Sequence, residues 1–416
     1  MRSSRPDCSC RPGTGLSGIQ VPIYLDNNAT TRTDPSVVQA MLPFFTEQFG
    51  NASSTHVFGG EVAVAMKQAR SSLRGLLGCA YDREIVFTSG GTEANNAAIL
   101  SALATQEGRD EIVTTSVEHS AVLAVAEQLA ASGVKTHVVP VDSRGRLDIE
   151  AFRSALGPRT AIASVMWANN ETGTIFPVEF LAGLTHEAGA LFHTDAVQVV
   201  GKMRVDLKDS AIDMLSLSAH KLHGPKGIGA LYLRKGTSFR PLIWGGSQER
   251  RRRGGTENIP AIVGLGKAAE LAAERLEPER VRIAALRDRL EQGILHIGQC
   301  IALGDISNRL ANTTNIAFDH LEGEAIAHHL NRAGIAVSLG SACNAGSMEP
   351  SHVLRAMQVP AWSMRGAVRF SLSRETSFAE VDEVVCAVSD IVARLRAASR
   401  ESARLASHGS QSRSSM

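Results

Sequence analysis

The stretch Leu215-Ser-Leu-Ser-Ala-His-Lys221, followed by Leu-His-Gly-Pro-Lys-Gly227, carries the strongest signal of fold class in this chain. An apolar strand ends in Ser, His and Lys and passes at once into a Gly/Pro loop. A lysine at the end of a buried strand is costly unless it is paired, covalently bound or has its pKa lowered by desolvation. A neutral amine is what Schiff-base formation with a carbonyl compound requires. Taken alone, Lys221 is better explained as the solvated end of a strand.

Strand-like segments alternate with helical patterns through the middle of the chain. We expect strands at residues 84–88, 112–115, 135–139, 161–165, 190–193, 212–216 and 228–233. We expect helices, rich in Ala, Leu and Glu, at residues 93–106, 121–132, 149–156 and 178–188. This alternation predicts an α/β fold with a mostly parallel seven-stranded sheet and helices on both of its faces. Ligands of such sheets bind at the carboxyl ends of the strands, where Lys221 lies.

A second polar strand end, Ala190-Leu-Phe-His-Thr-Asp195, comes 26 residues before Lys221. Together the Asp and the Lys meet the needs of pyridoxal 5'-phosphate (PLP), which binds an amine through its aldehyde and an anion at its pyridinium nitrogen. The run Phe87-Thr-Ser-Gly-Gly-Thr92 fits the phosphate, because paired glycines and a helix N-terminus offer backbone N–H groups. Thr92 is also expected to cap this helix. This run alone is equally typical of an ordinary capped helix.

Three further positions carry candidate chemistry. Asn170 follows a strand and is suited to a substrate carboxylate or the ring oxygen, whereas Asn169 beside it fits an Asx-turn. His119 follows another strand and is suited to stack on a flat ring, although a lone His is more often structural. Cys343 lies among small residues and glycines in Ser341-Ala-Cys-Asn-Ala-Gly346. Because free cysteines are usually buried, a thiol in such a loop is interpreted as a nucleophile.

Length and composition limit the class of protein. The chain has 416 residues, of which 44% are hydrophobic and 20% charged, enough for a large domain and a smaller one with sizeable cores. The net charge of +1 gives no general case for a nucleic acid or an anionic membrane as partner. No apolar run approaches the roughly 18 residues of a membrane span. The six scattered cysteines favour a reducing cytoplasm.

The pattern changes after Gly255, which indicates a second domain. A long charged helix at residues 261–292 leads to a mixed segment with strands near 315–318 and 368–371. We expect a large cofactor-binding domain at residues 34–276. Residues 21–33 and 277–398 would form a smaller α+β domain that carries the Cys343 loop. Residues 1–20 are expected to be a disordered leader, and the Ser/Arg-rich residues 399–416 a disordered tail.

Taken together, these motifs resemble the cysteine desulfurases, which are PLP-dependent enzymes of fold type I and of the class V aminotransferase group. The resemblance spans about residues 23–395 and rests on segments 24–32, 87–96, 169–173, 193–198, 218–227, 253–258 and 341–347. The segments 166–177 and 191–198 look closest to the nitrogen-fixation (NifS-type) branch. The resemblance implies the fold-type I architecture, in which a large domain is joined to a smaller C-terminal α+β domain.

The resemblance also implies a role for each matching residue. Around the cofactor ring, Lys221 would bind PLP covalently, Asp195 would pair with the pyridine nitrogen, Gln198 would bond the phenolic oxygen, and His119 would stack on the ring and move protons. The residues implied at the phosphate are Gly91, Thr92, Ser218 and His220, with Thr256 reaching the phosphate of a neighbouring subunit. The enzyme would therefore be a homodimer with shared active sites. Asn170 would contact the cofactor and, with Arg369, bind the substrate carboxylate.

The implied reaction removes sulfur from L-cysteine. The Cys343 thiolate would attack the substrate sulfur, leaving alanine and a Cys343 persulfide. The sulfur would then pass to an iron–sulfur scaffold, of the nitrogenase type or another, or to a different acceptor protein. Cys343 is also the candidate for a transient iron–sulfur ligand.

Two other functions remain open from the sequence. The nearer one is selenocysteine lyase or another class V activity, against which the Ser341-Ala-Cys343 loop argues. The more distant one is a non-catalytic assembly scaffold, which would be expected to lack Lys221 or Cys343. The four arginines of residues 250–253 fit either a solvated loop or a docking site for an acidic partner.

Overall fold

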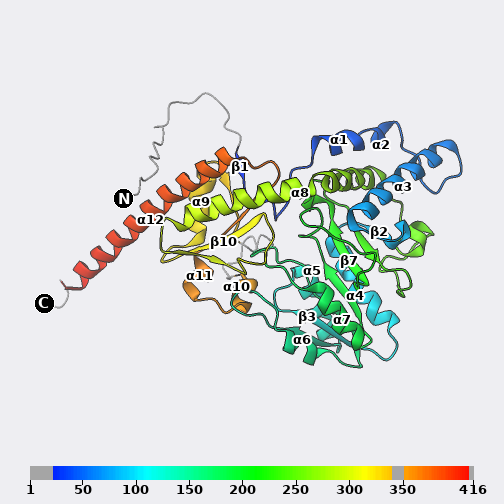
Figure 1. Ribbon diagram of the computed structural model, residues 1–416, viewed down its shortest axis with the longest axis horizontal. Coiled ribbons are helices and arrows are strands. Elements are labelled where there is room, and N and C mark those ends of the chain that lie inside the picture. Colours follow the sequence, from blue (N-terminus) through cyan, green and yellow to red (C-terminus); the bar gives the residue numbers. More distant parts are fainter. Residues whose placement is uncertain (1–21, 340–350, 412–416) are drawn as a thin grey trace.

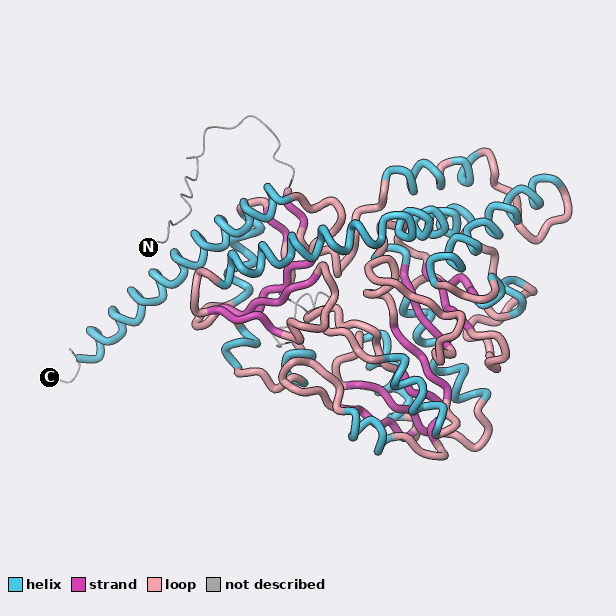
Figure 2. The backbone as a smooth tube through the Cα atoms, in the orientation of Figure 1, coloured by secondary structure: helices cyan, strands magenta, loops and turns pink. Residues whose placement is uncertain are grey.

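The computed structural model describes residues 22–339 and 351–411. Its strands fall into two groups, and the long helix α8 (Ile259–Leu295) runs from one group to the other (Figures 1 and 2). The helix begins at Asn258, whose side chain accepts a hydrogen bond from the Ala261 amide, and it contains Pro278. Among the described residues, no helix combines the length and the apolar character needed to cross a membrane.

The larger group is a seven-stranded sheet with the order β2-β8-β7-β6-β5-β3-β4. All neighbours are parallel except β8, which runs antiparallel to both β2 and β7. The α/β class and the mostly parallel seven-stranded sheet are therefore confirmed. The strands are β2 (Ile85–Thr88), β3 (Glu111–Thr115), β4 (Lys135–Val139), β5 (Thr160–Ser164), β6 (Leu191–Asp195), β7 (Met214–Ser218) and β8 (Gly229–Leu233).

Helices cover both faces of this sheet, because alternate strand residues are apolar on both sides. On one face Val86 and Ile162 pack against α4 (Gly91–Thr105) and α5 (Ser120–Ala131). The other face, which includes Phe87, packs under the remaining helices of this part. These are α3 (Val57–Leu77), α6 (Ile149–Ala155), α7 (Val178–Glu187) and the first half of α8. Two short helices, α1 (Pro35–Met41) and α2 (Pro43–Thr46), precede α3.

Two strands extend further than their apolar runs predicted. We expected strands at 190–193 and 212–216, but β6 continues to Asp195 and β7 to Ser218. Their polar ends remain in register with their neighbours, and Asp195 lies opposite Ser216. The backbone ladder therefore continues past the point where apolar side chains stop, and it carries the polar residues to the sheet's carboxyl edge.

The smaller group is an antiparallel sheet of order β12-β10-β9, formed by β9 (Cys300–Leu303), β10 (Thr313–Phe318) and β12 (Ala367–Ser371). Near the start of the chain, β1 (Ile23–Tyr24) pairs in parallel with β11 (Ile335–Ala336). A separate apolar core includes Ile316, Phe370 and Val384. The C-terminal part of the chain adds four helices: α9 (Gly323–Arg332), α10 (His352–Ala356), α11 (Ala361–Arg365) and α12 (Phe378–Gln411). Val353 and Leu354 of α10 pack in the core of the large sheet. The division at residues 33/34 and 276/277 stays a prediction.

The chain end differs from the prediction. Residues 399–411 were expected to be part of a disordered tail, but α12 continues through them to Gln411 and extends away from the rest of the chain (Figure 1). Ala, Arg and Leu have high helix propensity, so a helix that has already begun is extended at little cost.

Candidate functional site

A cavity of about 410 Å³ opens at the carboxyl edge of the large sheet and is lined by residues from both groups of strands. It brings together every predicted site residue in the described chain except Thr256. Those residues are Gly91, Thr92, His119, Asn170, Asp195, Gln198, Ser218, His220, Lys221 and Arg369.

Asp195 is the last residue of β6 and is 6% exposed. Its Oδ2 accepts a hydrogen bond from Asn95 Nδ2 at 2.7 Å, and its Oδ1 accepts one from the Val197 amide at 2.9 Å. Each carboxylate oxygen can accept more than one bond, so the group is held in place while it still faces the cavity. The carboxyl group is therefore held in one orientation in a largely buried position.

The glycine turn before α4 lies beside Ser218, the last residue of β7. A Cβ at Gly91 would stand 2.7 Å from Val197 Cγ2, so the backbone at Gly91 lies too close to Val197 for a residue with a side chain unless Val197 moves. A Cβ at Gly90 would stand 3.8 Å from Ser218 Oγ, which places that hydroxyl at the turn. The expectation that Thr92 caps the helix is wrong. The N-cap is Gly90, which leaves Thr92 within the first turn and its side chain on the cavity wall.

Lys221 ends the short 3-10 helix Ala219–Lys221 that follows β7. Its Nζ donates to the carbonyl oxygens of Asn28 and Ala29, at 2.5 and 2.7 Å. In His220, Nδ1 lies 3.1 Å from Thr30 Oγ1, and burial together with the Lys221 charge lowers the pKa of the imidazole to about 4. His220 is therefore neutral at physiological pH.

His119 is the N-cap of α5. Its Nδ1 accepts a hydrogen bond from the Ala121 amide at 3.1 Å. A neutral imidazole with an accepting Nδ1 carries its proton on Nε2. The helix start therefore selects the tautomer of a histidine that faces the cavity.

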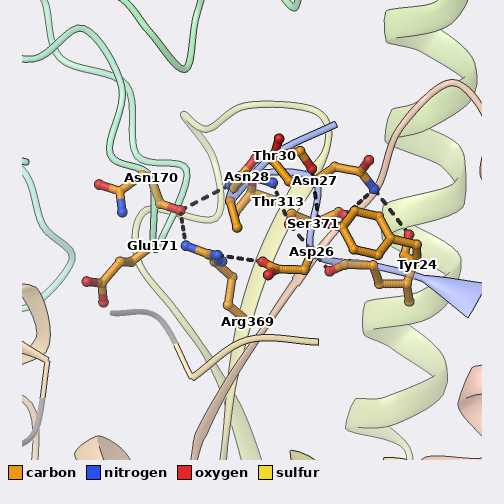
Figure 3. Close-up of polar contacts among 12 residues, drawn as sticks. Tyr24, Asp26, Asn27, Asn28, Thr30, Asn170, Glu171, Thr313, Arg369 and Ser371 are labelled. Carbon is orange, nitrogen blue, oxygen red and sulfur yellow. Dashed lines mark hydrogen bonds and ion pairs between the residues drawn. The ribbon is translucent and has the colours of Figure 1, made fainter. Parts of the chain in front are cut away.

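Arg369, in the middle of β12, is 1% exposed and enters the cavity from the smaller sheet. Its Nη1 donates to the Asn170 carbonyl at 3.0 Å, and its Nη2 to Asp26 Oδ1 at 2.7 Å (Figure 3). The neighbouring Asn169 forms the predicted Asx-turn, since its Oδ1 accepts from the amides of Glu171 and Thr172. The bonds of Arg369 to Asn170 and Asp26 hold its guanidinium where the two groups of strands meet.

Thr256 and Cys343 are not part of the described cavity. Thr256 is exposed and does not line it, and Cys343 lies outside the described residues. Residues 22–339 and 351–411 contain no cluster of His, Cys, Asp or Glu suited to a metal ion. The arginine run is partly used within the chain: Arg253 pairs with Glu93 at 3.0 Å, and Arg252 donates to the Arg83 carbonyl at 2.7 Å.

Sequence reasoning assigned no role to four residues at or next to the cavity: Asn28, Glu118, Glu171 and Lys202. Asn28 and Glu171 lie inside segments that the resemblance used, but no chemistry was attached to them. Lys202 lies four residues after Gln198. This spacing indicates a contact between the two side chains only once Gln198 is known to line a cavity. Glu118 precedes His119 in a polar stretch and reads as exposed, whereas it is buried.

Comparison with known proteins assigns the chain to a family. The family description "Aminotransferase class-V" matches residues 23–384. A cysteine desulfurase of Bradyrhizobium diazoefficiens is 83% identical over 389 residues, which cover 94% of this chain and 99% of that one. The chain belongs to the cysteine desulfurases of the class V aminotransferase family.

Two further relatives point to one branch of this family. The cysteine desulfurase NifS of Azotobacter vinelandii is 58% identical over 375 residues, covering 90% of this chain and 93% of its own. A solved structure titled NifS-like protein superimposes with a TM-score of 0.84 at 38% identity, covering 89% of this chain and 99% of that one. The fold-type I architecture is thereby confirmed.

Class V aminotransferases and cysteine desulfurases depend on PLP, and the residues present fit that group. The Gly90–Gly91 turn puts the start of α4, with its unpaired backbone N–H groups, at the cavity wall, where an anion can bind. Asp195 supplies a fixed anion and Lys221 an amine on the same cavity. The cavity volume of about 410 Å³ is within the range of sites that enclose small molecules.

Proposed function

We propose that this protein transfers sulfur from L-cysteine to Cys343, releasing L-alanine, for delivery to an iron–sulfur assembly system of the nitrogen-fixation type. The observation that carries the proposal is one cavity lined by Lys221, Asp195 and Arg369 together. When bound there, PLP supplies an electron sink for chemistry at the α-carbon of an amino acid. In this assignment Lys221 holds PLP, Asp195 faces its pyridine nitrogen and Gln198 its phenolic oxygen. Gly91, Thr92, Ser218 and His220 hold its phosphate.

Arg369 would bind the substrate carboxylate, with Asn170 beside it. A planar guanidinium offers two parallel N–H groups to a carboxylate. The bonds of Arg369 to Asp26 and the Asn170 carbonyl hold that plane in one orientation before the substrate arrives. A substrate held by its carboxylate at Arg369 presents its α-carbon to the Lys221 side of the same cavity.

Lys221 and His119 would move protons. Lys221 is already held by two backbone carbonyls, so its amine is positioned at the cavity wall as the base for the α-proton. His119 presents a protonated Nε2 and is assigned as the group that passes a proton to the departing fragment. The accepting bond at Nδ1 fixes the tautomer from which that transfer begins.

Cys343 would be the nucleophile. Its thiolate attacks the substrate sulfur, a sulfur–sulfur bond forms, and the carbon–sulfur bond breaks with its electron pair left on the carbon fragment. Protonation of that fragment gives alanine. Support comes from the chain that follows the Cys343 segment: Ser351 Oγ donates to Glu171 Oε2 at 2.5 Å, and His352 lines the cavity. A chain anchored there lets a residue eight positions earlier reach the substrate.

The sulfur acceptor and the cellular setting are part of the same proposal. The relative from Azotobacter vinelandii carries the name NifS, and this chain is 58% identical to it. We therefore favour an iron–sulfur scaffold of the nitrogen-fixation type as acceptor, with Cys343 as a transient ligand during transfer. A cytoplasmic location agrees with the reduced thiols of Cys79 and Cys300, which form no disulfide within the described chain.

A homodimer completes the proposed site. Phe45, Phe49 and Phe58, around α2 and the start of α3, are 62%, 67% and 53% exposed, and the rings of Phe49 and Phe58 stack at 5.6 Å. Exposed aromatic clusters mark interaction surfaces. Thr256 is exposed as well, as expected of a residue that serves the partner's phosphate.

Mixing two defective variants tests the shared site. K221A lacks the cofactor amine, whereas T256A would weaken the phosphate site of its partner. In a mixed dimer, one site combines the Lys221 of one subunit with the Thr256 of the other and is intact. Mixing should therefore restore activity above the sum of the two variants. Light scattering should show a dimer that F49D, but not the control F378D, dissociates; a monomeric wild type or absent complementation refutes the shared site.

Alanine release from L-cysteine tests the function itself. Wild type is expected to form alanine and, with reductant, sulfide. C343A should bind PLP but form neither, while the control C386A should match wild type. Equal alanine release by wild type and C343A would assign a lyase reaction instead, and a faster reaction with selenocysteine would favour that alternative. Loaded enzyme that releases no alanine contradicts the proposal.

A further inference from the structure

Lys202 lies behind Gln198, which is part of the cavity wall. Its Nζ donates to Gln198 Oε1 at 2.7 Å and to Asn28 Oδ1 at 3.3 Å. Burial, with Lys221 and Arg369 nearby, lowers the pKa of Lys202 well below its usual value. Both the charged and the neutral amine carry enough N–H groups for two amide oxygens, so Lys202 is a donor in either state.

The amide of Gln198 has one orientation that satisfies its neighbours. Its Nε2 lies 3.0 Å from the carbonyl oxygen of Asn28, which can only accept a hydrogen bond. Its Oε1 must then face Lys202, which donates. One N–H of the amide is used on Asn28. The other belongs to a side chain that lines the cavity and is 6% exposed.

Asn28 is fixed independently of Lys202. Its Oδ1 accepts from Asn312 Nδ2 at 2.9 Å, and its Nδ2 donates to Thr313 Oγ1 at 2.8 Å and to the Asn170 carbonyl at 3.0 Å (Figure 3). The same Asn170 carbonyl accepts from Arg369. Lys202 therefore bonds to Gln198 Oε1 and to Asn28 Oδ1, and the orientation of Asn28 is set by other partners.

We propose that Lys202 is a positioning residue that holds Gln198 with an N–H directed into the cavity, at the phenolic oxygen of the cofactor. The inference rests on the role of Gln198 in the proposed function. Without Lys202, Gln198 Oε1 loses the donor found for it in the described chain, and the bond from Nε2 to the Asn28 carbonyl is left to hold the amide. The amide can then rotate about that bond, so its second N–H is no longer held toward an ionised phenolic oxygen and stabilises it less.

The test compares K202M with Q198A and the double variant, all loaded with PLP. The ratio of the visible to the near-ultraviolet absorption band of bound PLP reports whether the ring oxygen is ionised. K202M is expected to lower this ratio and to weaken PLP binding by about 10-fold, the effect of one lost charge-assisted or buried hydrogen bond. Q198A should lower the ratio similarly, and the double variant should add little, because both changes remove the same bond.

Controls separate this role from a general loss of structure. K208M, a nearby exposed lysine, should behave as wild type, and K202R, which keeps N–H donors, should recover most of the band ratio. If K202M does not fold, K202L, which also lacks N–H groups, replaces it and is expected to show the same change. An unchanged ratio in the folded neutral variant, effects that add fully in the double variant, or a K202R that matches K202M would each overturn the inference. An unchanged ratio in Q198A would instead remove the premise, whereas alanine release by wild type tests the proposed function separately.

Discussion

Glu118 is a fully buried acid that borders the active-site wall. Its Oε1 accepts from Thr115 Oγ1 at 2.7 Å and from the Met166 amide at 2.9 Å, and its Oε2 has no hydrogen-bond partner within the described chain. Burial raises the pKa of Glu118 to about 8, and the Asp195 charge acts in the same direction. The side chain is therefore a neutral acid at pH 7.

This pKa makes the stability of the protein depend on pH. Because the folded state binds the proton more tightly than the unfolded state, Glu118 contributes stability that is complete below pH 4.5 and is lost as the pH rises through about 8. At about 1.36 kcal/mol per pH unit, the interval corresponds to about 5 kcal/mol, of which about 2–3 kcal/mol disappears between pH 6 and pH 9. In E118Q the amide keeps an accepting oxygen and does not ionise, so this loss should be absent.

Urea unfolding of wild type, E118Q and the exposed control E107Q at several pH values measures the effect. We expect wild type and E107Q to lose about 2–3 kcal/mol more than E118Q between pH 6 and pH 9, with E118Q the more stable protein at pH 9. Parallel pH profiles for wild type and E118Q would show that Glu118 does not titrate in this range, and the reasoning from its burial would fail.

Three other predictions concern substitutions that each disturb one group of contacts. D195N removes the anion that Asn95 and Val197 hold, and it should lower the alanine release rate about 100-fold or more while PLP stays bound, as absorbance shows. R369K loses the planar fork and should raise KM for L-cysteine about 10-fold or more, with a smaller change in kcat. E249A leaves Arg70 buried without its 2.6 Å partner and should lower the free energy of unfolding by about 3 kcal/mol or more in urea titration. A stability loss below about 1 kcal/mol, the range of exposed pairs, would contradict that assignment.

The sequence predicted the large sheet well because its strands are short apolar runs separated by amphipathic helices. It predicted Asp195 and Lys221 because polar residues that end apolar strands are visible in a linear sequence. It placed the ends of β6 and β7 too early, because side-chain polarity does not report where backbone pairing stops. It also assigned Thr92 a capping role that Gly90 has, since a helix start is decided by backbone geometry.

The role of Asn28 could not be predicted from its own segment. Its partners Gln198, Thr313 and Lys221 are 170, 285 and 193 residues away along the chain. Glu118 was missed for a related reason: a carboxylate beside a histidine usually lies in water, and its burial comes from packing under Met166 and Thr115. Both residues become visible only when distant segments are brought together.

Residues 26–31 tie the two groups of strands to one cavity. Asp26 pairs with Arg369 of the small sheet, while Asn28 accepts from Lys221 and the Thr31 amide donates to the His220 carbonyl at 2.9 Å, both on the large sheet. A displacement of one sheet against the other would stretch bonds on both sides of this segment. The distance between Arg369 and Lys221, which we propose bind the substrate carboxylate and the cofactor, is therefore set by a short stretch near the start of the chain. Because reaction rates fall steeply when bound groups are misplaced by about 1 Å, that stretch belongs to the active site as much as the strand ends do.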